Sequence, residues 1–320
     1  MISTALVTGA DGFVGTRLCR LLLQRDWHLI AAHRGLLSSQ DFPGMRHERL
    51  ALSKDTKKWQ EALESIDCVV HLAAQVHQIG RDSELQHTFN EVNIEGSRFV
   101  AEQCVRSGVK RLVFISTAKV NGEGGDLQAY DASDPPHPQD AYARSKLAAE
   151  LAIRSICAPA GVEFVIIRPP LVYGPGVRAN FRRLLRIAEL GVPLPLASID
   201  NRRSLVCVDN LADFIETCMT HPKAHGRVWL ISDGEDVSTP ELIRRLARCM
   251  GKRAILFRCP TGFLRSAAAL VGLSAEAERL CNSFTLDSTP ARAILDWNAP
   301  MSLDEGLLQA VMDYKTRRKI

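Results

Sequence analysis

Hydrophobic and polar positions along the first 170 residues follow two alternating periods. Short apolar runs, typical of buried strands, are separated by longer segments whose apolar residues recur at helical spacing. The predicted strands lie at 5–7, 29–32, 49–52, 68–74, 111–116 and 164–168. The predicted helices lie at 13–24, 59–63, 91–107 and 141–156. This alternation predicts an α/β fold with a Rossmann-type, doubly wound parallel sheet.

The alternation becomes less regular after Tyr173, where a turn at 174–176 interrupts it. Later strands are predicted at 203–208 and 228–231, and later helices at 181–190, 211–220 and 240–250. A chain of 320 residues exceeds the usual size of one domain. We therefore expect a dinucleotide-binding domain at 1–174 and a smaller C-terminal α/β lobe at 175–320. This lobe should bind substrate and interleave with the last elements of the sheet.

Composition narrows the choice of partners and compartment. The formal net charge is +4 and the basic clusters are scattered, so we expect no nucleic-acid partner. The most apolar late stretch, 263–273, contains Arg265 and is too short to cross a bilayer, so we expect no membrane partner. The nine cysteines form no C-x-x-C pair and no close set with histidines, which predicts no metal site and a reducing compartment. Since no leader pattern precedes the first strand, we expect a cytoplasmic protein.

Three glycines follow the first predicted strand and open the first predicted helix, in the run T-G-A-D-G-F-V-G at 8–15. Such glycines permit a tight turn, a close backbone approach to a ligand and close helix packing. The helix N-terminus then offers free N–H groups and a positive dipole end to a pyrophosphate. This strand–turn–helix context predicts a dinucleotide site. We assign to it Gly9, Asp11, Gly12, Phe13, Val14 and Gly15.

The end of the second predicted strand bears on which nicotinamide cofactor binds. A carboxylate there would bind the ribose 2′-hydroxyl of NAD and repel a 2′-phosphate. The sequence instead reads A-A-H-R at 31–34, with no acid before Asp41. Arg34 suits bidentate binding of a 2′-phosphate, although a solvated arginine in a loop is the alternative. We favour NADP, with NAD as the other possibility.

Tyr142 and Lys146 lie four residues apart on the predicted helix 141–156, so their side chains face the same way. A phenol is a poor acid–base group at neutral pH unless a neighbouring cation stabilises its anion. A lysine one turn away can supply that cation and can also hold the nicotinamide ribose. The pair alone would equally fit a helix surface. Its position after the buried strand that ends in Ser116-Thr117 favours catalysis.

With this pair and the G-x-x-G-x-x-G spacing, the chain resembles the extended short-chain dehydrogenase/reductase family. The resemblance extends over essentially the whole sequence and implies an NAD(P)-dependent oxidoreductase. It implies that Tyr142 exchanges a proton with the substrate oxygen, and that Thr117, with Ser116 as second candidate, hydrogen-bonds the same oxygen. It also implies a homodimer through the helices 91–107 and 141–156. Further cofactor contacts implied by matching segments are Leu72, Ala73, Ala74, Asn93, Lys146 and Pro169.

One branch of this family acts on nucleotide-diphosphate sugars, and the later sequence resembles that branch. Asn180 follows the Y-G-P-G loop, where the branch binds the diphosphate, and Arg203 matches an arginine that reaches the phosphates. Arg279 is a plausible second phosphate ligand, and we include Lys119 among the substrate contacts. The alternatives are that Asn180 caps a helix, that Arg203 pairs with an aspartate at 209 or 213, and that Arg279 is a surface residue.

The residues after Thr117 bear on the reaction. Sugar 4,6-dehydratases of the family carry an acidic pair there, whereas Ala118 and Lys119 stand here, so dehydration is excluded. The two remaining reactions are reduction of a 4-keto sugar and 4-epimerisation. Asn121 replaces the tyrosine usual in epimerases, and Arg34 favours NADPH.

Together these features resemble bacterial UDP-4-keto-6-deoxy-N-acetylglucosamine 4-reductases, which serve polysaccharide and O-antigen sugar synthesis. We therefore expect a UDP-sugar 4-ketoreductase, with a UDP-hexose 4-epimerase, such as one acting on UDP-N-acetylglucosamine, as the alternative. A reductase of non-nucleotide carbonyl compounds and a non-catalytic dinucleotide sensor stay open as further alternatives.

Overall fold

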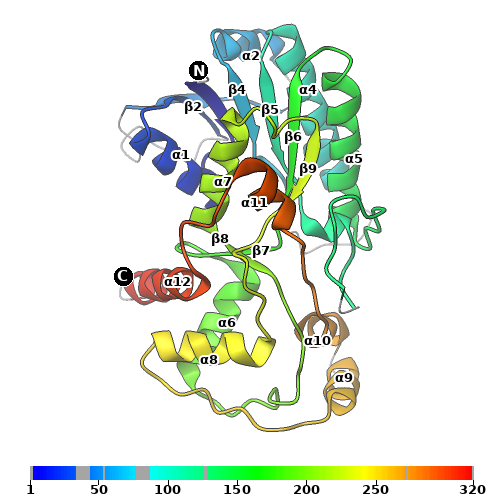
Figure 1. The fold of residues 1–320 in the computed structure, drawn as a ribbon, viewed down its shortest axis with the longest axis vertical. Helices are drawn as coiled ribbons and strands as arrows, with labels where there is room; N and C mark the ends of the chain where they lie inside the picture. Colours follow the sequence, from blue (N-terminus) through cyan, green and yellow to red (C-terminus); the bar gives the residue numbers. More distant parts are fainter. Residues whose placement is uncertain are drawn as a thin grey trace.

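A computed structural model describes residues 3–33, 44–52, 55–76, 87–125, 128–270 and 272–318. Within these residues, a seven-stranded parallel sheet has the order β3-β2-β1-β4-β5-β6-β9 (Figure 1). The strands are β1 (Thr4–Thr8), β2 (His28–His33), β3 (Arg46–Arg49), β4 (Cys68–His71), β5 (Arg111–Ile115), β6 (Glu163–Arg168) and β9 (Arg227–Leu230). The strand order reverses between β1 and β4, as in doubly wound dinucleotide-binding sheets. The predicted fold class is confirmed.

Helices cover both faces of this sheet because the strands are apolar on both sides. Successive residues of β1 point to opposite faces: Val7 packs in one core, and Leu6 packs in the other. The helices of the first face are α1 (Phe13–Gln24), α7 (Val208–Thr220) and α11 (Thr289–Leu295). Those of the second face are α2 (Thr56–Leu63), α4 (Gly96–Arg106) and α5 (Ala141–Cys157).

A second lobe lies beyond one end of the sheet (Figure 1). Its apolar core is shared by a short parallel pair, β7 (Leu171–Tyr173) and β8 (Leu205–Cys207), and by three helices. These helices are α6 (Ala179–Leu190), α8 (Thr239–Cys249) and α12 (Leu303–Arg318), with α9 (Thr261–Leu270) and α10 (Ser274–Cys281) nearby. The later elements β9 and α7 nevertheless belong to the sheet layers. The division into domains at 1–174 and 175–320, with the second interleaved with the last sheet elements, stays a prediction.

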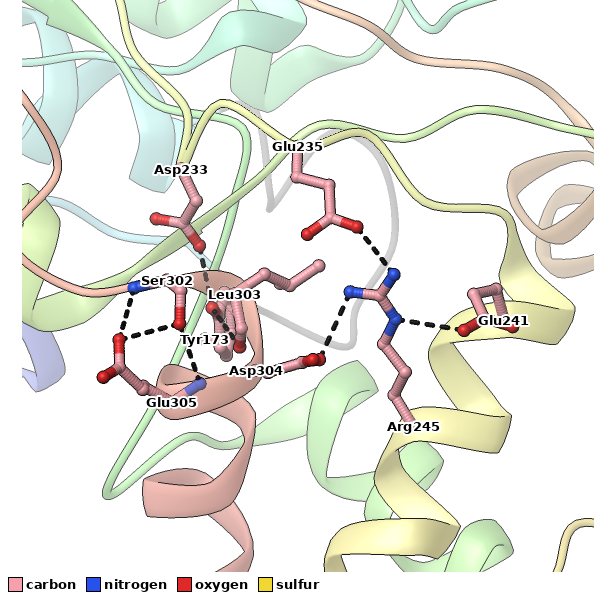
Figure 2. Close-up of polar contacts among 9 residues, drawn as sticks. All are labelled: Tyr173, Asp233, Glu235, Glu241, Arg245, Ser302, Leu303, Asp304 and Glu305. Atoms are coloured by element: carbon pink, nitrogen blue, oxygen red, sulfur yellow. Dashed lines mark hydrogen bonds and ion pairs between the residues drawn. The ribbon is translucent and has the colours of Figure 1, made fainter.

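Two clusters of polar contacts join elements of the second lobe to one another, and Figure 2 shows both of them. The Tyr173 hydroxyl donates to Asp233 at 2.7 Å and lies 3.3 Å from the carbonyl oxygen of Leu303. Arg245 on α8 pairs with Glu235, Glu241 and Asp304. Tyr173 is the last residue of β7, so these contacts hold the end of that strand against the start of α12.

Two elements differ from the sequence-based expectation. The third strand is Arg46–Arg49 and not 49–52, because this edge strand carries polar residues and its apolar signal lies just after it. The predicted helix 91–107 begins as a π-helix, η1 (Asn90–Glu95), which continues into α4. In the described part of the chain, no helix is long and apolar enough to cross a membrane.

Candidate active site

The carboxyl ends of β1 and β4 meet at the reversal of strand order, where doubly wound sheets bind their ligands. Here Thr8 and His71 share a hydrogen bond of 2.7 Å between Oγ1 and Nδ1. The same hydroxyl oxygen accepts from the backbone N of Ala73 at 3.2 Å. The other ring nitrogen of His71 lies 3.0 Å from the hydroxyl of Ser97, and burial lowers the histidine pKa to about 3. A neutral histidine therefore fixes the floor of this crevice.

The glycine loop lies directly above that floor. Gly9 has φ +69°, and a Cβ placed on it would lie 2.8 Å from the backbone N of Ala73. A Cβ on Gly15 would lie 2.1 Å from the carbonyl oxygen of Gly9. Gly12 forms the N-cap of α1 without a side chain of its own over the helix end. A dinucleotide pyrophosphate fits this bare helix N-terminus, which leaves its N–H groups accessible.

The remaining predicted cofactor residues of this region lie around the loop. Leu72 and Ala73 form the backbone against which Gly9 turns, and Ala74 follows them. The Phe13 ring would lie 3.7 Å from a Cβ added at Gly176, so the first helix and the later Y-G-P-G loop approach each other. Val14 instead packs against the core, which makes its contribution to a cofactor one of backbone position.

Arg34 lies outside the described residues, so its place at the cofactor is untested. The described end of β2 carries His33, which is paired in register with Arg49 of β3. Burial lowers the pKa of His33, His47 and Arg49 lower it further, and Asp11 acts in the opposite direction. The described end of this edge thus carries Arg49 beside His33, with Glu48 on the same strand paired to Arg46 and with Asp11 in the glycine loop.

The helix with the candidate catalytic pair is fixed at its first turn. The Asp140 side chain is the N-cap of α5 and accepts from the backbone N of Ala143 at 2.7 Å. Lys119 places its Nζ 2.6 Å from Asp140 Oδ2 and 2.7 Å from Glu123 Oε1. In this structure Lys119, predicted to bind substrate, ties the loop after β5 to the start of α5.

Tyr142 and Lys146 follow on the first two turns of α5. The Tyr142 ring lies 6.0 Å from that of Phe89, and Lys146 is 2% exposed, with its Nζ 4.0 Å from the centroid of Phe114. Burial lowers the pKa of Lys146 to about 7, against the opposing effect of Glu150. Burial also raises the pKa of Tyr142, and Asp140 adds to the shift.

The expected lowering of the tyrosine pKa by Lys146 is thus not found in the protein alone. Burial, with the negative charge of Asp140, sets the direction of the Tyr142 pKa shift instead.

Asn93, expected near the active site, lies in η1, and both polar atoms of its side chain are hydrogen-bonded to residues outside this helix. Its Oδ1 accepts from the backbone N of Gln75 at 2.8 Å, and its Nδ2 donates to the Gln75 carbonyl at 3.1 Å. The same Nδ2 donates to Ser145 Oγ at 2.9 Å, and Ser145 donates to the carbonyl of Tyr142 at 2.7 Å. Asn93 therefore links the segment after β4 to the helix turn between Tyr142 and Lys146.

The two hydroxyl candidates after β5 separate clearly. Ser116 is buried and donates to Glu150, which Arg168 binds with two nitrogens at 2.9 and 2.6 Å. The single hydroxyl proton of Ser116 is therefore donated to the Glu150–Arg168 ion pair and not toward a substrate oxygen. Thr117 is half-buried and starts the short helix η2 (Ala118–Val120). Pro169, the remaining cofactor candidate, is buried beside this turn and accepts from the Ala118 backbone N at 2.9 Å.

Arg203 and Arg279 come together in the lobe. Arg203 donates through Nη1 to the carbonyls of Arg279 at 2.6 Å and Asn282 at 3.1 Å. Burial lowers the Arg203 pKa, Glu123 raises it, and the charge of Arg279 lowers it again. The pairing of Arg203 with an aspartate at 209 or 213, the alternative considered above, is wrong.

Those two aspartates bind other partners, since Asp209 pairs with Arg17, and Asp213 pairs with Arg25. Arg279 itself is exposed. Asn180 is exposed in the first turn of α6, whose N-cap is Arg178, so Asn180 is not the cap residue of this helix.

Several residues that shape this region belong to none of the sequence motifs described above. Glu150 and Arg168 form a buried ion pair, and Arg168 also donates to Asn121 Oδ1 at 3.0 Å. Arg168 was a usable signal, because it ends the buried strand predicted at 164–168 and a buried arginine needs a partner. Asp140, directly before a helix, was likewise recognisable as an N-cap. Gln75, His71 and Ser145 had no such signal, because their partners are distant in sequence.

Comparison with known proteins places this site in a family. Residues 5–232 match the model of the NAD dependent epimerase/dehydratase family. The chain belongs to that family. It is therefore an oxidoreductase-type enzyme of the extended short-chain dehydrogenase/reductase class, as the motifs predicted.

Three known proteins illustrate the likeness. The chain is 38% identical over 318 residues to UDP-glucose 4-epimerase from Vibrio cholerae, covering 98% of this chain and 96% of the relative. It is 26% identical over 321 residues to N-acetyl-α-D-glucosaminyl-diphospho-ditrans,octacis-undecaprenol 4-epimerase from Escherichia coli O157:H7, covering 96% and 94%. The solved structure of MoeE5 in complex with UDP-glucose and NAD matches with a TM-score of 0.78 and 26% identity, covering 99% of this chain and 100% of that one.

Proposed function

We propose that this family member carries out hydride transfer at C4 of a UDP-linked sugar. The observation that carries the proposal is the position of Lys146, which is buried one turn after Tyr142 on a helix tied by Asn93 and Ser145 to the cofactor crevice. A buried ammonium group is costly unless it has a function or a partner, and its pKa of about 7 reflects that cost.

The glycine loop and the crevice floor suit the dinucleotide. Gly9, Gly12 and Gly15 would receive the pyrophosphate at the N-terminus of α1, with Ala73 and Ala74 alongside. Lys146 would hold the nicotinamide ribose. When bound, the nicotinamide supplies a hydride to C4 or accepts one from it.

The proton at O4 would be handled by the protein. In reduction, Tyr142 would donate its phenol proton to O4 as the hydride reaches C4, and Lys146 would stabilise the phenolate that results. Thr117 would hydrogen-bond the same oxygen and polarise the carbonyl. Since burial raises the Tyr142 pKa in the protein alone, the phenol is a stable proton donor, and turnover depends on nearby positive charge in the complex.

The lobe would bind the nucleotide diphosphate. Arg203 is held by two carbonyls with its guanidinium kept in one orientation, and Arg279 adds a second positive charge to it. Two arginines and a neutral donor such as Asn180 suit two phosphate charges. Lys119 is half-buried and paired with Asp140 and Glu123. If it contacts the sugar, it would do so while it keeps these two ion pairs.

Two reactions fit this chemistry, and each has its own support. Reduction of UDP-4-keto-6-deoxy-N-acetylglucosamine with NADPH is favoured by the basic end of β2 and β3, where His33 lies beside Arg49. A UDP-hexose 4-epimerase with retained NAD is favoured by the Vibrio cholerae relative at 38% identity. We propose reduction as the leading function and 4-epimerisation as the second candidate.

Two parallel assays distinguish them. In the first, purified protein is mixed with UDP-4-keto-6-deoxy-N-acetylglucosamine and NADPH or NADH, and the absorbance of the reduced cofactor is followed. In the second, UDP-N-acetylglucosamine or UDP-glucose is supplied without added cofactor, and its C4 epimer is sought by chromatography. Stoichiometric NADPH consumption supports reduction. Epimer formation with NAD retained by the purified protein supports the second candidate, and activity in neither assay contradicts both.

A further inference from the structure

The helix α9 (Thr261–Leu270) is unusual because none of its residues is buried. Phe263 is 68% exposed and Leu270 is 89% exposed, and they lie seven residues apart on one side of the helix. Leu273, just after the helix, is 49% exposed. A soluble protein rarely presents a phenylalanine and leucines side by side to water without a partner.

The segment before α9 also exposes apolar side chains. Phe257 and Leu194 are joined by a backbone hydrogen bond of 3.0 Å, so residues 255–257 run as an extended strand beside the 194–197 connection. Ile255 is 53% exposed and Phe257 is 50% exposed, while Leu256 between them is less exposed. This alternation directs Ile255 and Phe257 outward on one side. In Figure 1 the connection from α8 and the helix α9 lie at the end of the lobe farthest from the main sheet.

The same stretch is strongly basic. Between Glu241 and Glu276 the sequence contains no aspartate or glutamate. Its seven cations are Arg244, Arg245, Arg248, Lys252, Arg253, Arg258 and Arg265. Arg245 is held by acids on the lobe, as Figure 2 shows, and Arg265 lies 3.4 Å from Glu278. Lys252, Arg253 and Arg258 are exposed, and they flank Ile255 and Phe257 in sequence.

We propose that this α9 surface, made of Ile255, Phe257, Phe263, Leu270 and Leu273 with Lys252, Arg253 and Arg258, binds the surface of an anionic phospholipid bilayer. Aromatic and leucine side chains enter the boundary between headgroups and acyl chains, and flanking lysines and arginines bind anionic headgroups. A second copy of this chain is a poor occupant of the surface, because two such basic patches would face each other. The expectation of no membrane partner rested on the length needed to span a bilayer, and binding on its surface needs no such length.

This contact adjoins the candidate diphosphate end of the active site. The helix α9 packs against α10, whose last turn carries Arg279 and whose carbonyls hold Arg203. The enzyme would therefore work at the membrane surface with its substrate pocket beside the lipid. The proposal does not depend on which sugar is reduced or epimerised.

Flotation with lipid vesicles tests the proposal on the full chain. We expect binding to vesicles of phosphatidylcholine with phosphatidylglycerol, little binding to phosphatidylcholine alone, and release at high salt. The double variant F263S/L270S should lose most of this binding, by several-fold in bound fraction. The variant R253E/R258E, which leaves the apolar residues intact, should also lose it.

A matched control uses exposed apolar residues elsewhere. L308S/M312S changes side chains of α12 that are 46% and 61% exposed, and it should bind anionic vesicles like the unmodified protein. All variants should keep their melting temperature and their activity on soluble substrate, because the changed side chains are exposed. No binding of the unmodified protein to anionic vesicles would overturn the proposal, as would equal loss in the control. A change of oligomeric state in F263S/L270S, measured by light scattering, would show instead that the surface joins two copies.

Discussion

The side-chain amide of Asn93 donates to the hydroxyl of Ser145, which in turn donates to the carbonyl of Tyr142. Asn93 Oδ1 also accepts from the backbone N of Gln75, and the same Nδ2 donates to the Gln75 carbonyl, so one buried amide connects the segment after β4 to α5. The first turn of α5 is fixed independently by Asp140. The position of Tyr142 relative to the crevice thus depends on two anchors that are distant in sequence.

Replacement of Asn93 by alanine should displace Tyr142 more than it weakens the cofactor site. We expect kcat to fall on the order of 100-fold, because small misplacements of a reacting group have such effects. The unpaired groups left behind should cost about 1–3 kcal/mol of stability. Ser145→Ala removes the same link, so the double variant should be no worse than either single variant in kcat. Additive losses in steady-state kinetics would mean that the two residues act independently.

Tyr142→Phe removes the proposed proton donor without changing the ring. We expect a loss of kcat on the order of 10²–10⁴-fold while NADPH still binds, measured by fluorescence titration. The Phe89 contact of the ring should be retained, so the melting temperature should change little. If the variant no longer bound the cofactor, the tyrosine would have a structural role and the proposed proton transfer would be incorrect.

Arg203→Ala should weaken the binding of UDP and UDP-sugars. The loss of charge-assisted hydrogen bonds corresponds to about 1.5–3 kcal/mol, or roughly 10- to 100-fold in Kd. Arg202→Ala is the matched control, because Arg202 is the exposed neighbour of Arg203 and carries the same charge. Calorimetric titration with UDP measures both. Equal Kd values for the two variants would exclude Arg203 as the diphosphate ligand.

Arg49→Glu should shift cofactor preference from NADPH toward NADH. Arg49 lies beside His33 at the end of β2, where a 2′-phosphate would be received, so reversal of its charge should reduce the NADPH to NADH preference on the order of 10-fold. Arg34→Ala, outside the described residues, should act in the same direction. Arg46→Glu, at the opposite end of β3, is the control. If Arg46→Glu changes the preference as much, the effect is one of general surface charge.

The pH dependence of stability should reveal His71. Its pKa falls from 6.5 to about 3 on folding, because burial between Thr8 and Ser97 disfavours the charged ring. The unfolded chain then binds an extra proton below pH 6.5, so His71 makes the protein less stable as pH falls from about 6.5 to about 3.

The slope from this one group is about 1.4 kcal/mol per pH unit within that window. In a series of denaturant unfolding experiments at different pH, His71→Gln should lose less stability as pH falls than the unmodified protein does. His225→Gln, which changes an exposed ring, should lose as much as the unmodified protein. Identical slopes for all three proteins would mean that His71 titrates normally.

Much of this molecule follows from local sequence pattern. The apolar runs predicted the strands of the main sheet except the polar edge strand β3. The glycine spacing predicted the tight turn after the first strand, where Gly9 and Gly15 leave no room for a Cβ. The Tyr142 and Lys146 spacing likewise predicted their shared helix. In each case the signal lies within a few residues, so local geometry decides the outcome.

The interactions that could not be predicted join residues far apart in sequence. The bond from Ser116, the second candidate after Thr117, to Glu150 joins residues 34 apart in sequence, and the bond from Arg203 to the Arg279 carbonyl joins residues 76 apart. The pKa of Tyr142 was expected to fall because of Lys146, whereas burial of the site raises it. Sequence periodicity predicts neither which distant residues become partners nor how strongly a side chain is desolvated.

The central claim is hydride transfer at C4 of a UDP-linked sugar, and isotope transfer tests it most directly. NADPH deuterated at the transferable position of the nicotinamide is incubated with the enzyme and UDP-4-keto-6-deoxy-N-acetylglucosamine, and the product is analysed by NMR and mass spectrometry. We predict one deuterium at C4 of the product, with Tyr142→Phe giving almost none. Absence of deuterium at C4, together with no C4 epimerisation of UDP-hexoses, would contradict the account.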